Sequence, residues 1–135
     1  MENSRKLIIS EANNRLSKQW VTTEITWSEF VERLSKPKIT AETLDEFLSY
    51  SKAKQDEIKD VGGFVGGKLK GNLRRSEAVE SRCLITLDLD NLAYEDDTKI
   101  IKTLNSLGCA YAVYSTRKHQ TTKPRIRVIF PLAQD

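Results

Sequence analysis

Hydrophobic and polar residues alternate most regularly between residues 84 and 90, which read Leu-Ile-Thr-Leu-Asp-Leu-Asp. Because successive side chains of a strand point to opposite faces, this alternation predicts a strand that carries Asp88 and Asp90 on one face. The apolar residues Ile85, Leu87 and Leu89 then lie on the opposite face, where we expect them to be buried. Two carboxylates on one face of a strand are a typical mounting for a metal site.

Three further elements are predicted after this strand. Residues 95–107 have the apolar spacing of a helix, and Gly108 is expected to end it. The buried stripe of this helix is predicted to consist of Ile100, Ile101, Leu104 and Leu107. Strand-like runs follow at residues 109–116 and 124–131, the second alternating arginine with apolar residues. The order strand, helix, strand, strand predicts the first part of a split β-α-β, ferredoxin-like module. Its first two strands should be parallel neighbours and its third antiparallel.

The N-terminal residues predict a helical scaffold with one short strand at residues 6–10. Thr26 and Glu29 have the spacing of a capping box, so a helix is expected to start there and to end before Pro37. A second helix is predicted to start at Thr40 and to continue to roughly residue 54. These helices are expected to support the remainder of the chain.

We expect a single domain over residues 1–135, of the mixed α/β (α+β) class. Within it, residues 1–58 form the mainly helical scaffold, and residues 59–135 carry the sheet and the chemistry. The sheet is expected to be incomplete at the C-terminus, because a split β-α-β module closes with a further helix and strand. Trp20 and Trp27 are predicted to be buried anchors of the core.

Composition excludes disorder and membrane insertion, since 39% of the 135 residues are hydrophobic, 30% are charged and the formal net charge is only +3. The N-terminus lacks the basic start and long apolar stretch of a signal peptide, so a cytoplasmic protein is expected. Cys83 and Cys109 are too far apart for a zinc knuckle and fall in predicted interior strands. Both are therefore expected to be buried, reduced thiols.

Basic residues flank the acidic pair on both sides. Those before it are Lys68, Lys70, Arg74 and Arg75, and those after it are Arg117, Lys118, Lys123, Arg125 and Arg127. The first group belongs to a segment that starts with glycines at residues 62–67. A twisted hairpin explains these glycines better than a phosphate cradle, because neither the P-loop pattern nor the dinucleotide fingerprint is present. The basic groups are candidates for binding nucleic acid.

Acidic and basic side chains gathered in this way predict a site for chemistry on nucleoside triphosphates. Side chains two residues apart on a strand are separated by roughly 6.5 Å and can lean onto two cations, for which Mg²⁺ or Mn²⁺ is suitable. Ser115 and His119 end the neighbouring strand, and Arg125 with Arg127 could clamp a triphosphate. Two simpler interpretations stay open: the acids cap a loop, and the arginines are exposed on an edge strand.

These motifs, in this order, resemble those of the archaeo-eukaryotic primase superfamily, especially the primase-polymerase domains of phage and plasmid replication proteins. The first motif of that family, apolar residues followed by Asp-x-Asp, is similar to residues 85–90. Its second motif, a small residue and a histidine after a strand, resembles residues 114–119 with extra spacing. The glycine-rich segment, Arg82 and the Lys-Pro-Arg-x-Arg run from Lys123 are similar to the phage branch. The resemblance covers residues 59–132.

The resemblance implies a DNA-directed primase or polymerase that uses Mg²⁺ or Mn²⁺, with nucleoside triphosphates and a DNA template as partners. Asp88 and Asp90 would ligate the metals and act in catalysis with His119. The residues that contact nucleotide or phosphate would be Arg82, Ser115, Arg117, His119, Arg125 and Arg127. Those that contact nucleic acid would be Lys68, Lys70, Arg74 and Arg75. A replication helicase or another protein is a further expected partner.

The third motif of the superfamily, an apolar residue followed by an acid, does not occur before Asp135. The chain is therefore expected to be the N-terminal part of such a catalytic domain, and its activity stays open. The alternative is a non-catalytic relative that binds nucleic acid or a replication or defence protein. An RNA-recognition module fits the order of elements but lacks aromatic residues on its central strands. An unfinished sheet also favours a homodimer.

Overall fold

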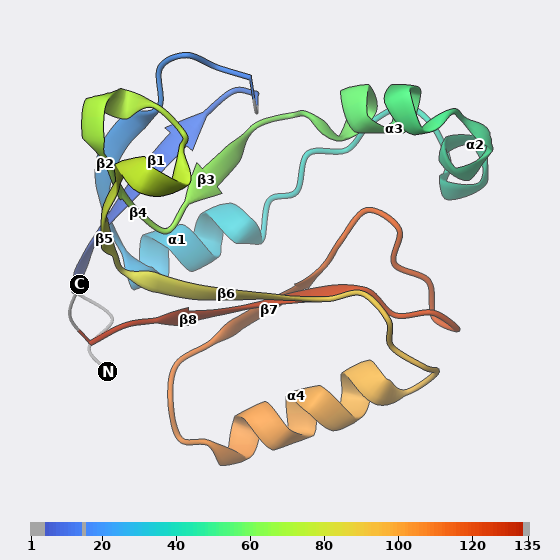
Figure 1. Cartoon of the computed structure of the whole chain (residues 1–135). Coiled ribbons are helices and arrows are strands. Elements are labelled where there is room, and N and C mark those ends of the chain that lie inside the picture. Colours follow the sequence, from blue (N-terminus) through green and yellow to red (C-terminus); the bar gives the residue numbers. More distant parts are fainter. Residues whose placement is uncertain (1–4, 15, 134–135) are drawn as a thin grey trace. The chain divides into compact units, whose positions relative to one another are not determined.

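The computed structural model describes residues 5–14 and 16–133 of the chain (Figure 1). The fold is mixed α/β, with antiparallel sheets and short helices, so the predicted fold class is confirmed. The described residues form two compact units, residues 5–83 and Leu84–Ala133. The acidic pair and all predicted elements from residue 84 onward lie in the second unit.

Five strands build the described part of the first unit, residues 5–14 and 16–83. The strands β1 (Lys6–Ala12), β2 (Val21–Thr26) and β3 (Gly63–Val65) form an antiparallel sheet in the order β2-β1-β3. The strands β4 (Gly67–Leu69) and β5 (Val79–Arg82) form a second antiparallel pair. The strand predicted at residues 6–10 is confirmed as β1, whereas β2 was not predicted. The region expected to be mainly helical therefore contains a sheet as well.

The helix α1 (Trp27–Leu34) begins with the predicted capping box. The backbone N–H of Glu29 donates to the Thr26 hydroxyl oxygen (3.1 Å), and the backbone N–H of Thr26 donates to the Glu29 carboxylate (3.3 Å). The hydrogen bonds from Thr26 lower the pKa of Glu29, because they favour the charged carboxylate. Phe30 of α1 packs edge-on against Phe64 of β3. Trp20 and Trp27 are both buried, as predicted.

The second predicted helix is in fact two helices, α2 (Leu44–Ser49) and α3 (Lys52–Lys59). Thr43 caps α2 in a capping box with Glu46. Ser51 caps α3, where its hydroxyl accepts from the backbone N–H of Lys54 (3.3 Å). An N-cap residue needs extended backbone dihedrals, so Ser51 interrupts the helical run that the apolar spacing had suggested.

The glycine-rich segment forms β3, β4 and the first of two short 3₁₀ turns, η1 (Lys70–Asn72) and η2 (Ser76–Ala78). A Cβ atom at Gly67 would lie 1.9 Å from the carbonyl oxygen of Ser81 on β5. Glycine is therefore required there by the close approach of two backbones. A twisted hairpin was expected for the segment; instead β3 pairs with β1, and β4 pairs with β5.

The second unit contains β6 (Leu84–Leu89), α4 (Asp96–Ser106), β7 (Ala112–Ser115) and β8 (Ile126–Pro131). The predicted order of elements is confirmed, and α4 lies along one face of the sheet (Figure 1). The strand order is β6-β8-β7, with both pairings antiparallel. β6 and β7 are therefore parallel to each other but are not neighbours. The expectation of adjacent parallel strands was wrong, because β8 is inserted between them.

Leu104 of α4 forms the core of this unit with Ile126 and Val128 of the central strand β8. Leu89 and Ile100 pack against that core, as predicted. Ile85 and Leu87 are each 45% exposed, however, so their predicted burial was wrong. The reason is that β6 is an edge strand, which pairs only with β8 among the described strands. In the predicted helical stripe, Ile101 and Leu107 are also partly exposed.

The two cysteines are free thiols in different surroundings. Cys83 is buried, as predicted, and its thiol donates to the carbonyl oxygen of Ile8 (3.2 Å). Cys109 is exposed, because it follows the turn at Gly108 and precedes β7 instead of lying in a strand. None of the described helices combines the length and the apolar character needed to cross a membrane.

Candidate functional site

The cross-strand register of the second unit gathers polar side chains on the sheet face opposite to α4. We call this face the acidic face; its side chains are Asp88, Asp90, Tyr114, Arg125 and Arg127. Arg127 of β8 lies directly opposite Asp88 of β6 on one side and Tyr114 of β7 on the other. Directly opposite residues project to the same face of a sheet. An acid, an arginine and a tyrosine therefore form a row across all three strands. Val128, the next residue along β8, points to the other face and into the core with α4.

Arg127 is bound on both sides within this row. Its Nε donates to Asp88 Oδ1 (2.5 Å), and its Nη2 lies 3.5 Å from Asp88 Oδ2. Its Nη1 donates to the Tyr114 hydroxyl oxygen (3.0 Å). Burial acts to lower the pKa of Arg127, but the bonds to Asp88 and Tyr114 outweigh burial and raise the pKa above its usual value. Arg127 is therefore a permanently charged, well-fixed group.

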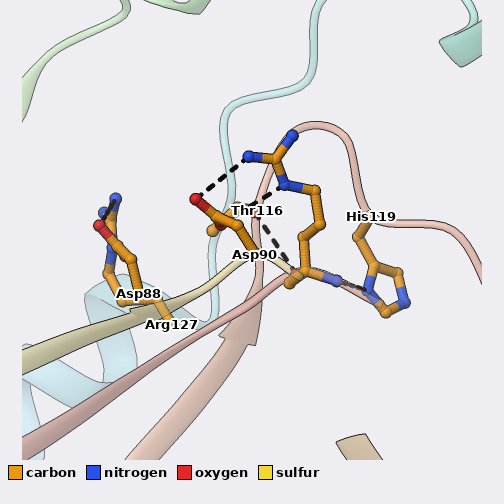
Figure 2. A network of polar contacts seen from close by, with 6 residues as sticks. Asp88, Asp90, Thr116, His119 and Arg127 are labelled. Atoms are coloured by element: carbon orange, nitrogen blue, oxygen red, sulfur yellow. Dashed lines mark hydrogen bonds and ion pairs between the residues drawn. The ribbon is translucent and has the colours of Figure 1, made fainter. Parts of the chain in front are cut away.

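Asp90 and Arg125 form a second pair beside the first (Figure 2). Nη2 of Arg125 lies 3.2 Å from Asp90 Oδ2, and its Nε lies 3.4 Å from Asp90 Oδ1. Figure 2 shows Asp88 and Asp90 on the same side of the ribbon, each meeting its own guanidinium. The two acids were expected on one face and the two arginines near enough to clamp a triphosphate; these contacts bring the four side chains together, and their roles stay predictions.

His119 is tied to the same place through the backbone of Arg125. The backbone N–H of Arg125 donates to His119 Nδ1 (3.0 Å), and the backbone N–H of His119 donates to the carbonyl of Thr116 (3.0 Å). The backbone N–H of Thr116 in turn donates to the carbonyl of Arg125 (3.0 Å). Because Nδ1 accepts a hydrogen bond, Nε2 carries the proton of the neutral ring. The ring thus meets the Arg125 backbone through Nδ1, and Nε2 lies on the other side of the ring (Figure 2).

The other predicted residues are placed differently. Ser115 lies opposite Ile126, so it belongs to the α4 side of the sheet and not to the acidic face. Arg117 lies half-buried in the loop that leads to His119. The residues Arg82, Lys68, Lys70, Arg74 and Arg75 all belong to the first unit. The roles of all these residues stay predictions.

Within the first unit, the basic segment is held by Trp20. The guanidinium of Arg74 lies 5.7 Å from the centre of the Trp20 ring, and the backbone N–H of Trp20 donates to the carbonyl of Asn72 (2.8 Å). Lys68 forms an ion pair with Glu80 (3.6 Å). Lys70, Arg74 and Arg75 are exposed. A stacked, exposed arginine is suited to contact phosphates.

Tyr114 is a member of the acidic face that the sequence had not indicated. Strand alternation places it and not Ser115 on the face of Arg127, but this is visible only once β7 is known to pair with β8. The tyrosine is apolar enough to be taken for a core residue. Its hydroxyl group becomes informative only beside the guanidinium.

The acidic face offers two carboxylates to a metal ion. Within residues 5–14 and 16–133, no three His, Cys, Asp or Glu side chains are placed to hold a metal ion together. Mg²⁺ is commonly bound through one or two carboxylates, with water and substrate phosphates completing its octahedral shell. Asp88 Oδ2 and the carboxylate of Asp90 have only contacts of 3.2 Å or longer to the arginines. The donor set therefore fits a Mg²⁺ or Mn²⁺ ion that arrives with a nucleotide.

Comparison with known protein families identifies the family of the chain. The family model of the VapE N-terminal domain matches residues 1–135, the whole sequence. This domain is found in VapE proteins, which are associated with the replication of phages and plasmids. No curated protein and no solved structure matches the chain. Since the match covers every residue, the chain belongs to the VapE N-terminal domain family.

Proposed function

We propose that the acidic face binds a nucleoside triphosphate with Mg²⁺ or Mn²⁺, and that the chain acts as a primase-polymerase-like nucleotidyltransferase domain in phage or plasmid replication. The observation that carries this proposal is the pairing of Asp88 with Arg127 and of Asp90 with Arg125 on one face of the sheet. Family membership supports the replication context. The resemblance of residues 59–132 to primase-polymerases supplies the reaction class.

Charge balance supports a metal–nucleotide ligand over either component alone. Each acid is neutralised by its own arginine, so a bare cation must compete with a guanidinium and a bare triphosphate with a carboxylate. A metal–triphosphate complex satisfies both sets at once, since the carboxylates bind the cation and a guanidinium released from its carboxylate binds phosphate oxygens. Binding of metal and nucleotide is therefore expected to be strongly cooperative.

The roles of the individual residues follow from their positions. Asp88 and Asp90 would hold the metal, which when bound neutralises charge on the phosphates and on the leaving pyrophosphate. Arg125 would bind phosphate oxygens, and His119 would hold the Arg125 backbone in place through Nδ1, because both belong to one hydrogen-bonded turn. The primer hydroxyl or a second nucleotide would be the acceptor of the nucleotidyl group.

The test is calorimetric titration of the wild-type chain with a non-hydrolysable nucleoside triphosphate, in Mn²⁺ and in EDTA. We expect binding in Mn²⁺ and a loss of at least roughly tenfold in affinity in EDTA, since the phosphates then meet uncompensated carboxylates. Equal affinity in both conditions, or no binding in either, would remove the proposal.

DNA is the proposed template partner, and the basic segment of the first unit is the proposed contact. Replacing both Arg74 and Arg75 with glutamine should weaken DNA binding. The slope of log K against log salt concentration should become shallower by roughly two, since two phosphate contacts are lost. Replacing Lys52 and Lys54 of α3 instead removes the same charge elsewhere in the unit and should leave the slope nearer to that of the wild type. An unchanged slope in the arginine variant would contradict this assignment.

A second candidate is a non-catalytic binding module, and the Asp–Arg pairs also favour it. Cross-strand ion pairs stabilise sheets without any ligand, so the acidic face could be a purely structural ladder. Such a module would bind nucleic acid or a replication or defence protein through the basic segment. It would tolerate neutral substitutions of the acids without loss of binding, which separates it from the first candidate.

A further inference from the structure

The two Asp–Arg pairs of the acidic face are not equivalent. Asp88 and Arg127 meet at 2.5 Å, and Tyr114 holds the far nitrogen of the same guanidinium. Asp90 and Arg125 meet only at 3.2 and 3.4 Å. No hydrogen bond to a third side chain fixes the Arg125 guanidinium in the part of the chain that the structure describes. Arg127 is thus fixed by both Asp88 and Tyr114, whereas among the described side chains the Arg125 guanidinium is held by Asp90 alone.

Arg127 makes its short hydrogen bond to only one carboxylate oxygen of Asp88. Oδ1 accepts the short bond from Arg127 Nε, whereas Oδ2 lies 3.5 Å from Nη2. A carboxylate fixed through one oxygen can present the second to a cation in a defined direction. Hydrogen-bonding partners that orient a ligating side chain in this way commonly change metal affinity when removed.

We propose that Tyr114 and Arg127 are positioning residues for Asp88, and that Arg125 is the arginine that leaves its carboxylate to bind phosphate. This inference rests on the proposed function and adds a division of roles to it. Tyr114 fixes Arg127, Arg127 fixes Asp88 Oδ1, and Asp88 Oδ2 faces the cation. Arg125 keeps its backbone in place through His119 and Thr116 while its side chain exchanges partners.

Removal of Arg127 separates this proposal from simple competition between charges, because the two predict opposite changes in the affinity for Mn²⁺. If Arg127 only competed with cations for Asp88, removing it would raise the affinity for Mn²⁺. If it orients Asp88, removing it lowers that affinity. We expect Arg127→Gln to weaken Mn²⁺ binding about 10- to 100-fold. We expect Tyr114→Phe, which removes only one hydroxyl group, to weaken it about 3- to 10-fold.

Arg125 should behave in the opposite way. In Arg125→Gln the competitor of Asp90 is gone, so the affinity for Mn²⁺ alone should not fall. The affinity for the triphosphate in saturating Mn²⁺ should fall about tenfold or more, because a charge-assisted bond to phosphate is lost. The two arginine variants thus separate metal affinity from nucleotide affinity.

The experiment is titration of the full chain with Mn²⁺ followed by electron paramagnetic resonance, then calorimetry with a non-hydrolysable triphosphate. Tyr111→Phe is the matched control, because the Tyr111 hydroxyl donates to Asn105 and the ring packs against the α4 core. It should leave Mn²⁺ affinity unchanged. Circular dichroism melts verify that each variant is folded, and Tyr114→Phe decides the matter if Arg127→Gln does not fold.

The outcomes are distinct. Weaker Mn²⁺ binding in Tyr114→Phe and Arg127→Gln, with undiminished binding in Arg125→Gln, supports the division of roles. Wild-type levels in Tyr114→Phe, or stronger Mn²⁺ binding in Arg127→Gln, would overturn it while leaving the proposed function in place. A wild-type chain that binds no Mn²⁺ with or without nucleotide would overturn both.

Discussion

Asp88→Asn is expected to lower metal-dependent nucleotide affinity about 100-fold, which corresponds to about 2.7 kcal/mol. Asparagine keeps the size of the side chain and an oxygen that accepts from Arg127, but it removes the charge that binds the cation. The Asp88 side chain is 51% exposed, so the free energy of unfolding should fall by only about 1 kcal/mol or less. Calorimetric titration and a thermal melt measure the two quantities.

Asp90→Asn should give a similar loss of nucleotide affinity, since its carboxylate shares the same face. Asp97→Asn is the matched control, because it removes one negative charge from the first turn of α4 in the same unit. It should leave nucleotide affinity within about twofold of the wild type, since its charge acts only through screened solvent. Unchanged binding in both Asp88→Asn and Asp90→Asn would favour the structural ladder and the non-catalytic module.

Leu104→Ala is expected to destabilise the second unit by about 2–5 kcal/mol, the largest effect on stability that we predict for it. Leu104 is 8% exposed and packs with Ile126 and Val128, so truncation leaves a cavity beneath the central strand. Denaturant unfolding followed by circular dichroism, with hydrogen exchange on β8, reports the loss. The acidic face depends on this core, because β8 carries Arg127 and Arg125 directly precedes β8.

Two leucines of the same unit serve as controls for Leu104. Leu107 is 56% exposed at the end of α4, so Leu107→Ala should cost about 0.5 kcal/mol or less. Leu87 is 45% exposed on the edge strand, so Leu87→Ala should cost clearly less than Leu104→Ala. Equal losses in Leu87→Ala and Leu104→Ala would show that β6 is covered in solution and that its assignment as an exposed edge is wrong.

Local signals in the sequence predicted most elements of the fold. The alternation at residues 84–90 gave the correct faces for Asp88 and Leu89, because strand geometry relates neighbours two residues apart. The capping box of Thr26 and Glu29 located the start of α1, because all residues of a capping box lie within one helical turn. Such signals need no knowledge of distant contacts.

Features that depend on distant contacts were missed. The order β6-β8-β7 is decided by pairing between residues about 40 apart in sequence, and nothing in β6 itself reveals that it is an edge strand. The prediction that Ile85 and Leu87 are buried was wrong for that reason. The position of Ser115 on the α4 side and of Tyr114 on the acidic face follows from the same pairing.

The candidate site was predicted in its residue types more fully than in its geometry. Asp88 and Asp90 were expected on one face, with Arg125 and Arg127 near enough to clamp a triphosphate, and the structure brings the four together in two pairs. The pairing of each acid with its own arginine was not foreseen, because charge patterns along a sequence do not specify which opposite charges meet. This pairing is what makes cooperative binding of metal and nucleotide the expected behaviour.

The most direct test of the central claim is to locate Mn²⁺ on the chain by nuclear magnetic resonance in the presence of a non-hydrolysable triphosphate. At substoichiometric Mn²⁺, paramagnetic broadening should appear first at the backbone amides of Asp88, Asp90 and Arg125, and should disappear in Asp88→Asn. Broadening that starts instead at the acidic turn of residues 95–97, or that persists in Asp88→Asn, would contradict the assignment of the acidic face as a metal–nucleotide site.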